Sequence, residues 1–377
     1  MNQGFDGFAR QVMSGSRRGA AAGVLRAGLS LAEPFYLAGV SIRNRLYDLG
    51  ISKTTRLDRP VIAVGNLTAG GTGKTPMVRW IAEHLRDLGR HVAIIARGYK
   101  SKRGQLGDEQ RMLDRLLNGG GKDPVHLAAN PNRVEAARKL LSGHSEVDVL
   151  VLDDAFQHRA VERDLNIVLL NASEPFGHDH LLPRGLLREP ISSLRRADGV
   201  VLTHSNEVTS DRLSEIEERI ADLDSSIPVY RAVHAPIGLR SSRVSSSEPA
   251  TIQLEELRGL PIFAFCGLAS PDHFLRQLES LGAKVVGHRS FGDHHAYLPQ
   301  DVSSLRDQAR AANAQALITT EKDWIKLHEL HGAAETDPPV WRLDVQMQFM
   351  RDDQERLTAQ IESMLSHARK KRLHGVE

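Results

Sequence analysis

Residues 61–76 read VIAVGNLTAGGTGKTP, and this stretch decides the fold. A short run of mostly β-branched residues at 61–64 leads into a glycine-rich loop. Apolar side chains then recur at helical spacing from Thr75, and Gly89 ends the pattern as a helix C-cap would. A strand, a glycine-rich loop and a helix in this order are the setting of a P-loop, so the stretch predicts a site for nucleotide phosphates at the helix start.

Each residue type in this loop has a separate task in holding phosphate. Glycines let backbone amides converge on phosphate oxygens, Lys74 reaches the β- and γ-phosphates, and the Thr75 hydroxyl is offered to Mg²⁺. Thr68 stands where the strict GxxxxGK[ST] pattern has glycine, so the loop is a variant. The predicted nucleotide-binding residues are Thr68, Ala69, Gly70, Gly71, Thr72, Gly73, Lys74 and Thr75.

A second apolar run ends in two carboxylates. Asp153 and Asp154 directly follow the run at 149–152, as the acidic residue of a Walker B site follows its strand. We expect Asp153 to help hold Mg²⁺, and Asp154 to act beside Lys74 in catalysis by polarising a reacting group or a second ion. A solvated turn is the alternative for an Asp-Asp pair, and the neighbouring P-loop favours the metal site.

Short apolar runs continue along the chain and alternate with amphipathic stretches. This pattern predicts an α/β fold, in which a P-loop core has a largely parallel sheet flanked by helices. After a serine-rich stretch that ends at Pro249, similar runs predict a second, smaller α/β domain that closes over the active site. The expected divisions are 1–58, 59–240 and 241–377, and the expected strands are 61–64, 92–95, 149–152, 167–170, 200–202, 262–265, 284–286, 316–319 and 340–343.

The segment 1–58 is basic and partly apolar. Arg26, Glu33 and Pro34 interrupt its apolar residues, so no uncharged run approaches the roughly 18 to 20 residues that span a bilayer. The same interruption argues against a cleaved signal peptide. We expect an amphipathic helix here. These residues leave open whether it lies on an anionic membrane surface or packs on the protein's own core.

Composition limits the classes of function. The chain has 377 residues, of which 41% are hydrophobic and 25% charged, as in soluble globular proteins. A formal charge of +2 and only 5% aromatic residues give no support for nucleic-acid binding. Cys266 is the single cysteine, so an intrachain disulfide is excluded and a buried core thiol is expected. No obligate protein partner is indicated.

Nine collinear motifs between residues 65 and 323 point to one family. They are GNLTAGGTGKTP (65–76), ARGY (96–99), GDE (107–109), LDDAFQH (152–158), RDL (163–165), LLPRGLLREP (181–190), FCGLASP (265–271), DHH (293–295) and TTEKD (319–323). In these motifs the sequence resembles the tetraacyldisaccharide 4'-kinase family, the lipid A 4'-kinases of Gram-negative bacteria. The resemblance covers most of the chain.

The resemblance implies an activity, a substrate and a location. It implies transfer of the ATP γ-phosphate, with Mg²⁺, to the 4'-hydroxyl of tetraacyldisaccharide 1-phosphate (lipid A disaccharide 1-phosphate), which forms lipid IV-A. It also implies that the enzyme works at the cytoplasmic face of the inner membrane as a peripheral or monotopic protein. The basic segment 1–58 agrees with an acceptor that resides in an anionic membrane surface.

The resemblance also implies roles for individual residues. It pairs Asp108 with His294 to remove the hydroxyl proton, although by themselves these residues also suit a solvated helix start and a loop. The order of action within the pair stays open, as does the choice between His294 and His295. Glu109 is expected near the metal. The candidates for binding the acceptor or the γ-phosphate are Arg97, Gln157, His158, Arg188 and Glu189.

The sequence departs from the family pattern in three places. The loop before Asp108 is shorter than usual, the turn 177–180 reads GHDH, and Arg184 and Leu186 stand where alanine and proline are common.

Two alternative functions for a P-loop protein of this architecture are a nucleotide-driven switch and a ligase that phosphorylates a carboxylate. A membrane-bound module whose ATPase activity sets only its conformation is a further alternative, in which Asp108 and His294 would be dispensable.

Overall fold

The computed structural model describes residues 8, 11–98, 106–119, 123–241, 251–268, 271–292, 295–328 and 337–373. The chain forms two compact units. Gly7–His234 and Met347–Glu377 make up the first, which we call the P-loop unit, and Ala235–Gln346 make up the second, which we call the inserted unit. The inserted unit therefore interrupts the sequence of the P-loop unit.

The P-loop unit is built on a parallel sheet with the strand order β7-β6-β5-β1-β4-β2-β3. The chain runs from β1 outward to β2 and β3, returns to β4, and then continues on the other side of β1. Ligands bind at such a reversal, beyond the carboxyl ends of the strands. The strands are β1 (Val61–Asn66), β2 (Val92–Ala96), β3 (His126–Ala129), β4 (Val149–Leu152), β5 (Leu165–Asn171), β6 (Gly199–Thr203) and β7 (Val229–Ser241).

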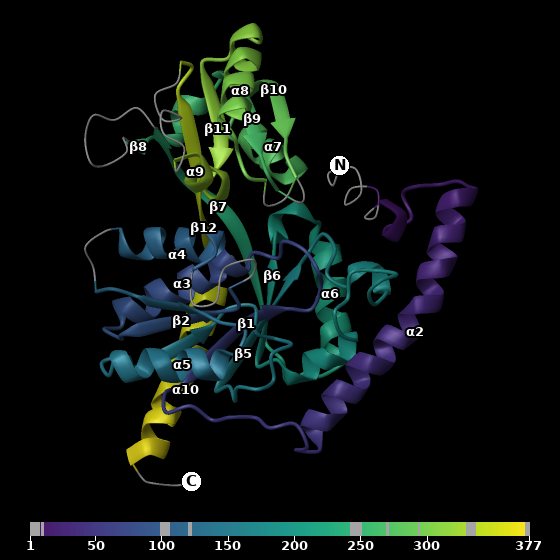
Figure 1. Cartoon of the computed structure of the whole chain (residues 1–377), viewed down its shortest axis with the longest axis vertical. Coiled ribbons are helices and arrows are strands. Elements are labelled where there is room, and N and C mark those ends of the chain that lie inside the picture. The colour runs from purple at the N-terminus through teal and green to yellow at the C-terminus, as the bar shows by residue number, and fades with distance from the viewer. Residues whose placement is uncertain are drawn as a thin grey trace. The chain divides into compact units, whose positions relative to one another are not determined.

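Helices cover both faces of this sheet (Figure 1). Successive strand residues point to opposite faces, and apolar side chains occur on each face, so both need a covering layer. Helices α3, α4 and α10 pack on the face that carries Ile62 and Val64, whereas α5 packs on the face that carries Val61 and Ala63. Helix α6 covers the same side as α5, against β5 and β6. The helices are α3 (Lys74–Asp87), α4 (Asp108–Asn118), α5 (Arg133–Gly143), α6 (Ser210–Ala221) and α10 (Asp353–Leu373), with short 3₁₀ turns at Gly177–Asp179, Ile191–Arg196 and Ser205–Glu207.

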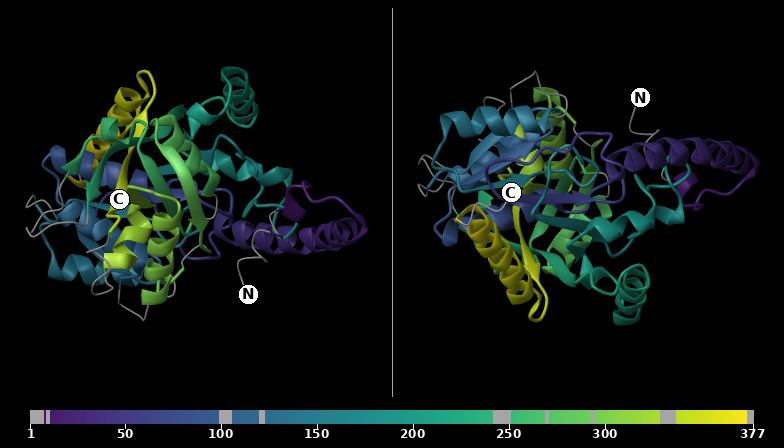
Figure 2. Two further views of the ribbon diagram at one scale, coloured as in Figure 1. Left: turned by 90° about the horizontal axis from the view of Figure 1, so that it is seen from above. Right: turned by 90° about the horizontal axis from the view of Figure 1, so that it is seen from below.

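Helix α2 (Ala20–Asp48) precedes the sheet and projects from the P-loop unit in both views of Figure 2. It confirms the expected helix in the N-terminal segment. Pro34 lies inside the helix, and the first turn carries no acidic residue. None of the helices in the described part of the chain combines the length and the apolar character that crossing a bilayer requires.

The inserted unit has its own parallel sheet in the order β10-β9-β11-β12, with β8 antiparallel to the end of β7. Its core contains Cys266, which is buried as predicted, and burial raises the pKa of its thiol to about 12. The elements are β8 (Thr251–Ile252), β9 (Pro261–Cys266), α7 (Pro271–Ser280), β10 (Lys284–Ser290), α8 (Pro299–Ala311), β11 (Ala316–Thr320), α9 (Glu321–His328) and β12 (Val340–Phe349), with a 3₁₀ turn at Leu254–Leu257.

The fold class is confirmed, but the units divide the chain differently from the expected boundaries. Every apolar run named above lies in a strand, whereas β3, β7 and β8 were not predicted. The expected second domain included all residues after 240. In the structure, Met347 and Phe349 and the helix α10 return to the P-loop unit, because their apolar side chains fill its core. Most of the expected serine-rich linker lies outside the described residues.

Candidate active site

The phosphate loop joins β1 to α3, and two of its glycines have conformations that favour glycine. Gly70 has φ 135°, and Gly73 is the left-handed N-cap of α3 with φ 79°. A Cβ at Gly73 would also come within 2.4 Å of Nε2 of His234. A Cβ at Gly71 would meet nothing within 4 Å, so this glycine is not required by packing. The loop shape therefore depends on Gly70 and Gly73.

The first half of the loop is fixed by the LLREP segment rather than being free for phosphate. The Ala69 amide donates to the Leu186 carbonyl at 2.7 Å, and the Arg188 amide donates to the Leu67 carbonyl at 2.9 Å. Thr68 is buried, and its carbonyl accepts from Asn66 Nδ2 at 2.7 Å. The amide of Ala69, which the sequence assigned to the nucleotide, is thus already used. Amides from Gly70 onward remain as the candidates.

The second half of the loop contains a buried polar atom that lacks a partner. Thr72 is 2% exposed, and its carbonyl accepts a hydrogen bond from Thr203 Oγ1 at 3.1 Å. The hydroxyl of Thr72 has no hydrogen-bond partner among the described residues. A buried donor without a partner is costly, so a site that supplies an acceptor such as a phosphate oxygen fits this position.

Two cations meet on the acidic turn after β4. Nζ of Lys74 lies 3.6 Å from Oδ1 of Asp154, and Nη1 of Arg188 lies 3.0 Å from the same oxygen. Asp154 has φ 48°, a left-handed conformation that turns the chain sharply at the strand end. The structure therefore brings Lys74, Asp154 and Arg188 together beside the phosphate loop.

The pKa values of the two aspartates in the turn are shifted in opposite directions. The pKa of Asp153 is raised to about 6, first by burial and then by the charges of Asp154 and Glu109, against the lowering effect of Lys74. Burial also acts to raise the pKa of Asp154, but Lys74 and Arg188 outweigh it and the net pKa is lowered. Asp154 is therefore stabilised as an anion. The nearby cations do not offset the burial of Asp153 and the negative charges beside it.

Arg133 supports this turn, and the sequence analysis missed it. It is 3% exposed, and its Nη2 donates to the carbonyls of Asp153 at 3.3 Å and Asp154 at 3.2 Å. Asn132 caps the helix that Arg133 begins, with its side chain accepting from the Glu135 amide. An arginine at a helix start has no sequence signal that separates it from a solvent-exposed one.

Gln157 and His158 continue from the acidic turn toward β1. Nε2 of Gln157 donates to the Asn66 carbonyl at 2.9 Å. Burial lowers the pKa of His158 to about 4, with the charges of Arg133 and Arg163 adding to the effect. His158 is therefore a neutral imidazole at physiological pH. Arg163 holds the turn by donating to the carbonyls of Ala155, Phe156 and His158.

Glu189 occupies a different environment from the one expected of a substrate ligand. Its side chain is fully buried and pairs with Arg196, and Nη2 of Arg43 lies 3.6 Å from its Oε1. Arg43 also donates to the Gln157 carbonyl, and the Tyr36 hydroxyl donates to the Arg188 carbonyl at 3.0 Å. Glu189 thus anchors α2 beside the site, which corrects its predicted contact with substrate.

Of the other predicted site residues, the structure describes Arg97 fully and Asp108 in part. Arg97 is exposed at the end of β2, and its charge contributes to lowering the pKa of His158. Asp108 begins α4 and precedes Glu109, whose charge acts on Asp153. The side chain of Asp108 and the whole of His294 lie outside the described residues. Their pairing therefore stays a prediction.

The neighbouring His295 is occupied by contacts within the inserted unit. Its Nε2 lies 3.0 Å from Oδ2 of Asp301, and its ring stacks on Phe291 at a centroid distance of 4.6 Å. Asp323 of the TTEKD motif is fully buried and accepts from the Gly267 amide and from the Thr320 hydroxyl, both at 2.8 Å. These contacts give His295 and Asp323 structural tasks.

The histidines of the GHDH turn do not converge. His178 pairs with Glu174, Asp179 pairs with Arg219, and His180 lies 3.0 Å from Glu33 of α2. The departure from the family pattern at this turn therefore provides further anchors, and one of them holds α2.

The motifs and the geometry agree with comparisons to known proteins. Residues 25–366 match the family described as tetraacyldisaccharide-1-P 4'-kinase, LpxK. The chain belongs to this family. The kinase is 37% identical over 321 residues to the tetraacyldisaccharide 4'-kinase of Halothermothrix orenii, covering 79% of this chain and 82% of the relative. It is 39% identical over 338 residues to that of Anaeromyxobacter sp. strain K, covering 85% and 86%.

A solved structure supports the same conclusion. LpxK from Aquifex aeolicus in complex with ATP matches the kinase with a TM-score of 0.67 and 30% identity, covering 90% of this chain and 99% of that one. Family membership confirms the prediction of an ATP-dependent P-loop kinase of lipid A biosynthesis, and it does not favour a nucleotide switch or a carboxylate-phosphorylating ligase.

Proposed function

We propose that the carboxyl edge of the sheet in the P-loop unit is where the kinase transfers the ATP γ-phosphate to the 4'-hydroxyl of tetraacyldisaccharide 1-phosphate. The observation that carries this proposal is the meeting of Lys74 and Arg188 on one oxygen of Asp154, beside the phosphate loop. Phosphoryl transfer spreads negative charge over the γ-phosphate oxygens, and two adjacent cations supply the opposite charge. Asp154 keeps both cations in place before nucleotide binds.

The nucleotide phosphates bind to the second half of the loop. The backbone amides from Gly70 to Thr75 and the Thr72 hydroxyl are the donors, since Ala69 is committed to Leu186. The start of α3 adds its positive dipole. Thr68 and Ala69 serve to fix the loop against LLREP rather than to contact ATP.

Asp153 and the Thr75 hydroxyl hold Mg²⁺, with Glu109 close to the same position. The fit follows from charge, because burial and two neighbouring carboxylates raise the pKa of Asp153 to about 6, and a divalent cation supplies the missing positive charge. When bound, Mg²⁺ neutralises phosphate charge and orients the phosphate chain. Arg133 keeps the turn in position through the two aspartate carbonyls.

The acceptor is bound and deprotonated by residues around this edge. Arg97, Gln157, His158 and Arg188 contact the acceptor or the γ-phosphate, and His158 does so as a neutral donor or acceptor. The proton of the 4'-hydroxyl is taken by the Asp108 and His294 pair. The choice of His294 over His295 is supported by the ion pair that His295 makes with Asp301.

Helix α2 rests on an anionic membrane surface at the cytoplasmic face of the inner membrane. Val24, Leu31, Phe35 and Ile42 are 74%, 74%, 81% and 61% exposed. Their spacing of seven, four and seven residues places them in one stripe of the helix. Exposed apolar stripes flanked by arginines such as Arg17, Arg18 and Arg45 suit an interfacial helix.

Residues of α2 outside this stripe connect the helix to the site. Tyr36 and Arg43 lie about 100° around the helix from Phe35 and Ile42, Glu33 lies about 180° from the stripe, and all three bind the P-loop unit. Tyr36 and Arg43 reach Arg188 and Glu189 directly. The helix therefore places the LLREP segment next to the membrane that holds the acceptor.

The test is transfer of label from γ-labelled ATP, with Mg²⁺, to tetraacyldisaccharide 1-phosphate in detergent micelles. Lys74→Ala should reduce labelling by about 1000-fold or more, whereas Lys139→Ala, an exposed lysine on α5, should leave it unchanged. Asp108→Ala and His294→Ala should each reduce labelling without weakening ATP binding. Full labelling by Lys74→Ala would exclude this edge as the transfer site.

A further inference from the structure

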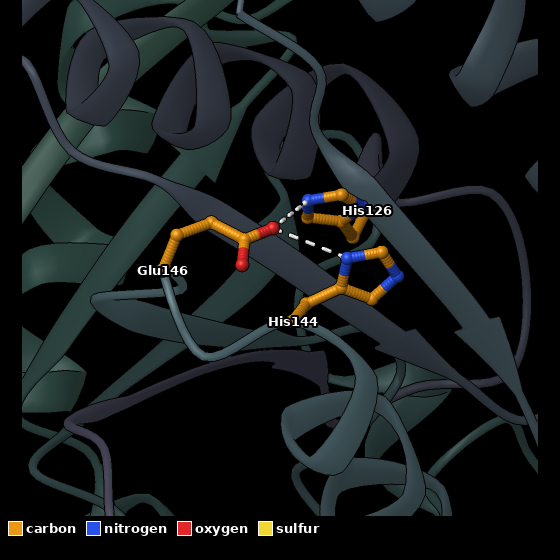
Figure 3. A group of neighbouring side chains, drawn as sticks. All are labelled: His126, His144 and Glu146. Carbon is orange, nitrogen blue, oxygen red and sulfur yellow. Dashed lines mark hydrogen bonds and ion pairs between the residues drawn. The ribbon is translucent and has the colours of Figure 1, made fainter.

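A second cluster of ligand-type side chains lies in the P-loop unit, apart from the acidic turn. One carboxylate oxygen of Glu146 contacts two imidazole rings. Nε2 of His126 and Nδ1 of His144 each lie 3.1 Å from its Oε1. The two rings stack with centroids 3.7 Å apart and an angle of 28° between their planes. Figure 3 shows both rings turned toward the same carboxylate.

The cluster lies at the opposite edge of the sheet from the phosphate loop. His126 is the first residue of β3, and His144 and Glu146 lie in the turn between α5 and β4. In a parallel sheet the starts of strands share one edge and their ends share the other. Four to six residues at about 3.3 Å each separate the two edges, so this cluster is distinct from the proposed Mg²⁺ site.

The spacing of the three ligand atoms suits a tetrahedral metal. Bonds of about 2.0 to 2.1 Å to nitrogen and oxygen put neighbouring ligands of a tetrahedron about 3.3 Å apart. The two histidine-to-glutamate distances are 3.1 Å, and all three ligand atoms lie within 4.8 Å of one another.

The turn that carries the ligands is held from outside the cluster. Nη2 of Arg59 donates to the Ser145 carbonyl at 3.1 Å, and its Nε donates to the Val147 carbonyl at 2.5 Å. These bonds fix the backbone on both sides of Glu146. His126 is fixed independently, because β3 pairs with β2 in register with Ala93. The ligands are therefore arranged before any ion binds, which favours binding.

We propose that His126, His144 and Glu146 form a binding site for a transition-metal divalent cation of the Zn²⁺ class. Two imidazole nitrogens and one carboxylate are the ligands of Zn²⁺, Co²⁺ and Ni²⁺, whereas Mg²⁺ requires oxygen ligands. The fourth position is open to water, because His144 and Glu146 are 42% and 44% exposed.

The ion joins β3 to the turn that leads from α5 into β4. β3 is the last strand of the sheet, and the cluster ties its first residue to the turn that begins β4. Binding to the folded state alone raises stability by mass action. The proposed ion is therefore a clamp on the edge of the sheet, and it takes no part in phosphate transfer.

The experiment titrates Zn²⁺ into the full-length kinase by calorimetry, after removal of metals and with excess Mg²⁺ present to occupy oxygen sites. The unchanged protein should bind one equivalent more than His144→Ala, which should weaken this site by at least about 100-fold because loss even of an outer ligand partner costs 10- to 100-fold. Glu146→Gln should also weaken it. Visible absorption of Co²⁺ in a four-coordinate site should appear in the unchanged protein and disappear in His144→Ala.

His288→Ala is the matched control, since His288 is an exposed histidine outside the cluster. It should bind the same number of equivalents as the unchanged protein. Zn²⁺ should raise the melting temperature of the unchanged protein and of His288→Ala, but not of His144→Ala. Equal stoichiometry and affinity in all three proteins would overturn the proposal, because the cluster would then contribute no site.

Discussion

The carboxyl edge of the sheet and helix α2 depart from ordinary protein surfaces in opposite ways. The edge buries charge, with Asp153, Arg133 and Glu189 at most 9% exposed. The helix exposes apolar side chains, and Phe35 is 81% exposed. Both arrangements cost free energy when the protein is alone in water.

The difference shows what each region lacks. At the edge, Asp153 lacks positive charge and the Thr72 hydroxyl lacks an acceptor, which a metal and a phosphate chain supply. On α2 the exposed stripe lacks an apolar surface, which a lipid layer would supply under the proposed function. In that proposal each region is completed by a different half of the reaction, the nucleotide at the edge and the lipid at the helix. The following tests separate the two.

The largest effect should come from Asp154→Asn. Removing this carboxylate leaves Lys74 and Arg188 without their shared anion, so both cations move and repel each other. We expect kcat to fall by about 1000-fold, with vesicle binding unchanged. Asp211→Asn, on the exposed first turn of α6, is the control for loss of one negative charge. An active Asp154→Asn enzyme would remove Asp154 from the mechanism.

Arg188→Ala should have the next largest effect, about 100-fold on kcat/KM for the lipid acceptor. Arg188→Lys should recover part of this loss, because the charge remains while the planar fork is lost. Steady-state kinetics with varied acceptor measures both. A full recovery by lysine would mean that Arg188 acts by charge alone.

Acid should reduce activity through Asp153. Burial raises the pKa of Asp153 to about 6, so its carboxylate takes up a proton below that pH. This proton competes with Mg²⁺ for the carboxylate. We expect kcat/KM for MgATP to fall about tenfold per unit below about pH 6, and the midpoint should move to lower pH when Mg²⁺ is raised.

Stability without metal should show the opposite trend for the same group. The folded state binds this proton more tightly than the unfolded state, so stability falls as pH rises from about 4 to about 6. Asp153→Asn should flatten this part of the stability curve in urea titrations with a chelator. An unchanged curve would place the buried charge elsewhere.

Leu31→Glu with Phe35→Glu should weaken binding to anionic vesicles by about tenfold or more, since two exposed apolar side chains and their buried area are lost. Transfer to acceptor in vesicles should fall in parallel, whereas transfer in detergent micelles should be retained. Leu88→Glu, another exposed leucine at the end of α3, is the matched control in a sedimentation assay. Equal sedimentation of both variants would exclude the stripe as the membrane contact.

Tyr36→Phe should have the smallest effect. It removes one neutral hydrogen bond to the Arg188 carbonyl, so the free energy of unfolding should fall by about 1 kcal/mol. Urea unfolding measures this, and micelle activity should fall by less than Arg188→Ala. A loss of activity as large as that of Arg188→Ala would mean that α2 positions the arginine directly.

Much of the edge could be predicted from the sequence because its residues belong to linear patterns. Lys74 follows a glycine-rich loop and Asp154 follows an apolar run, and the carboxyl ends of neighbouring parallel strands meet. Short β-branched runs predicted nine of the strands, but not β3, β7 or β8. Such patterns predict where a residue lies relative to the strand or helix next to it in the sequence.

The remaining residues depend on contacts between distant segments. Arg133, Thr203 and His234 approach the loop or the acidic turn from other elements, and their local sequences carry no motif. Glu189 was predicted to bind substrate because it follows Arg188 in the LLREP motif, but it is buried in ion pairs with Arg43 of α2 and Arg196. Periodicity indicates which side of an element is apolar, and it does not identify the partner of a polar residue.

The interruption of the P-loop unit by residues 235–346 has a consequence for the order of synthesis. Leu357, Ile361 and Met364 of α10 belong to the same core as Trp80, which follows the phosphate loop. During translation the inserted unit leaves the ribosome whole, while the unit that precedes it still lacks part of its interior. Because domains fold as units once their chain is complete, phosphate-binding competence arises only after the last helix has emerged.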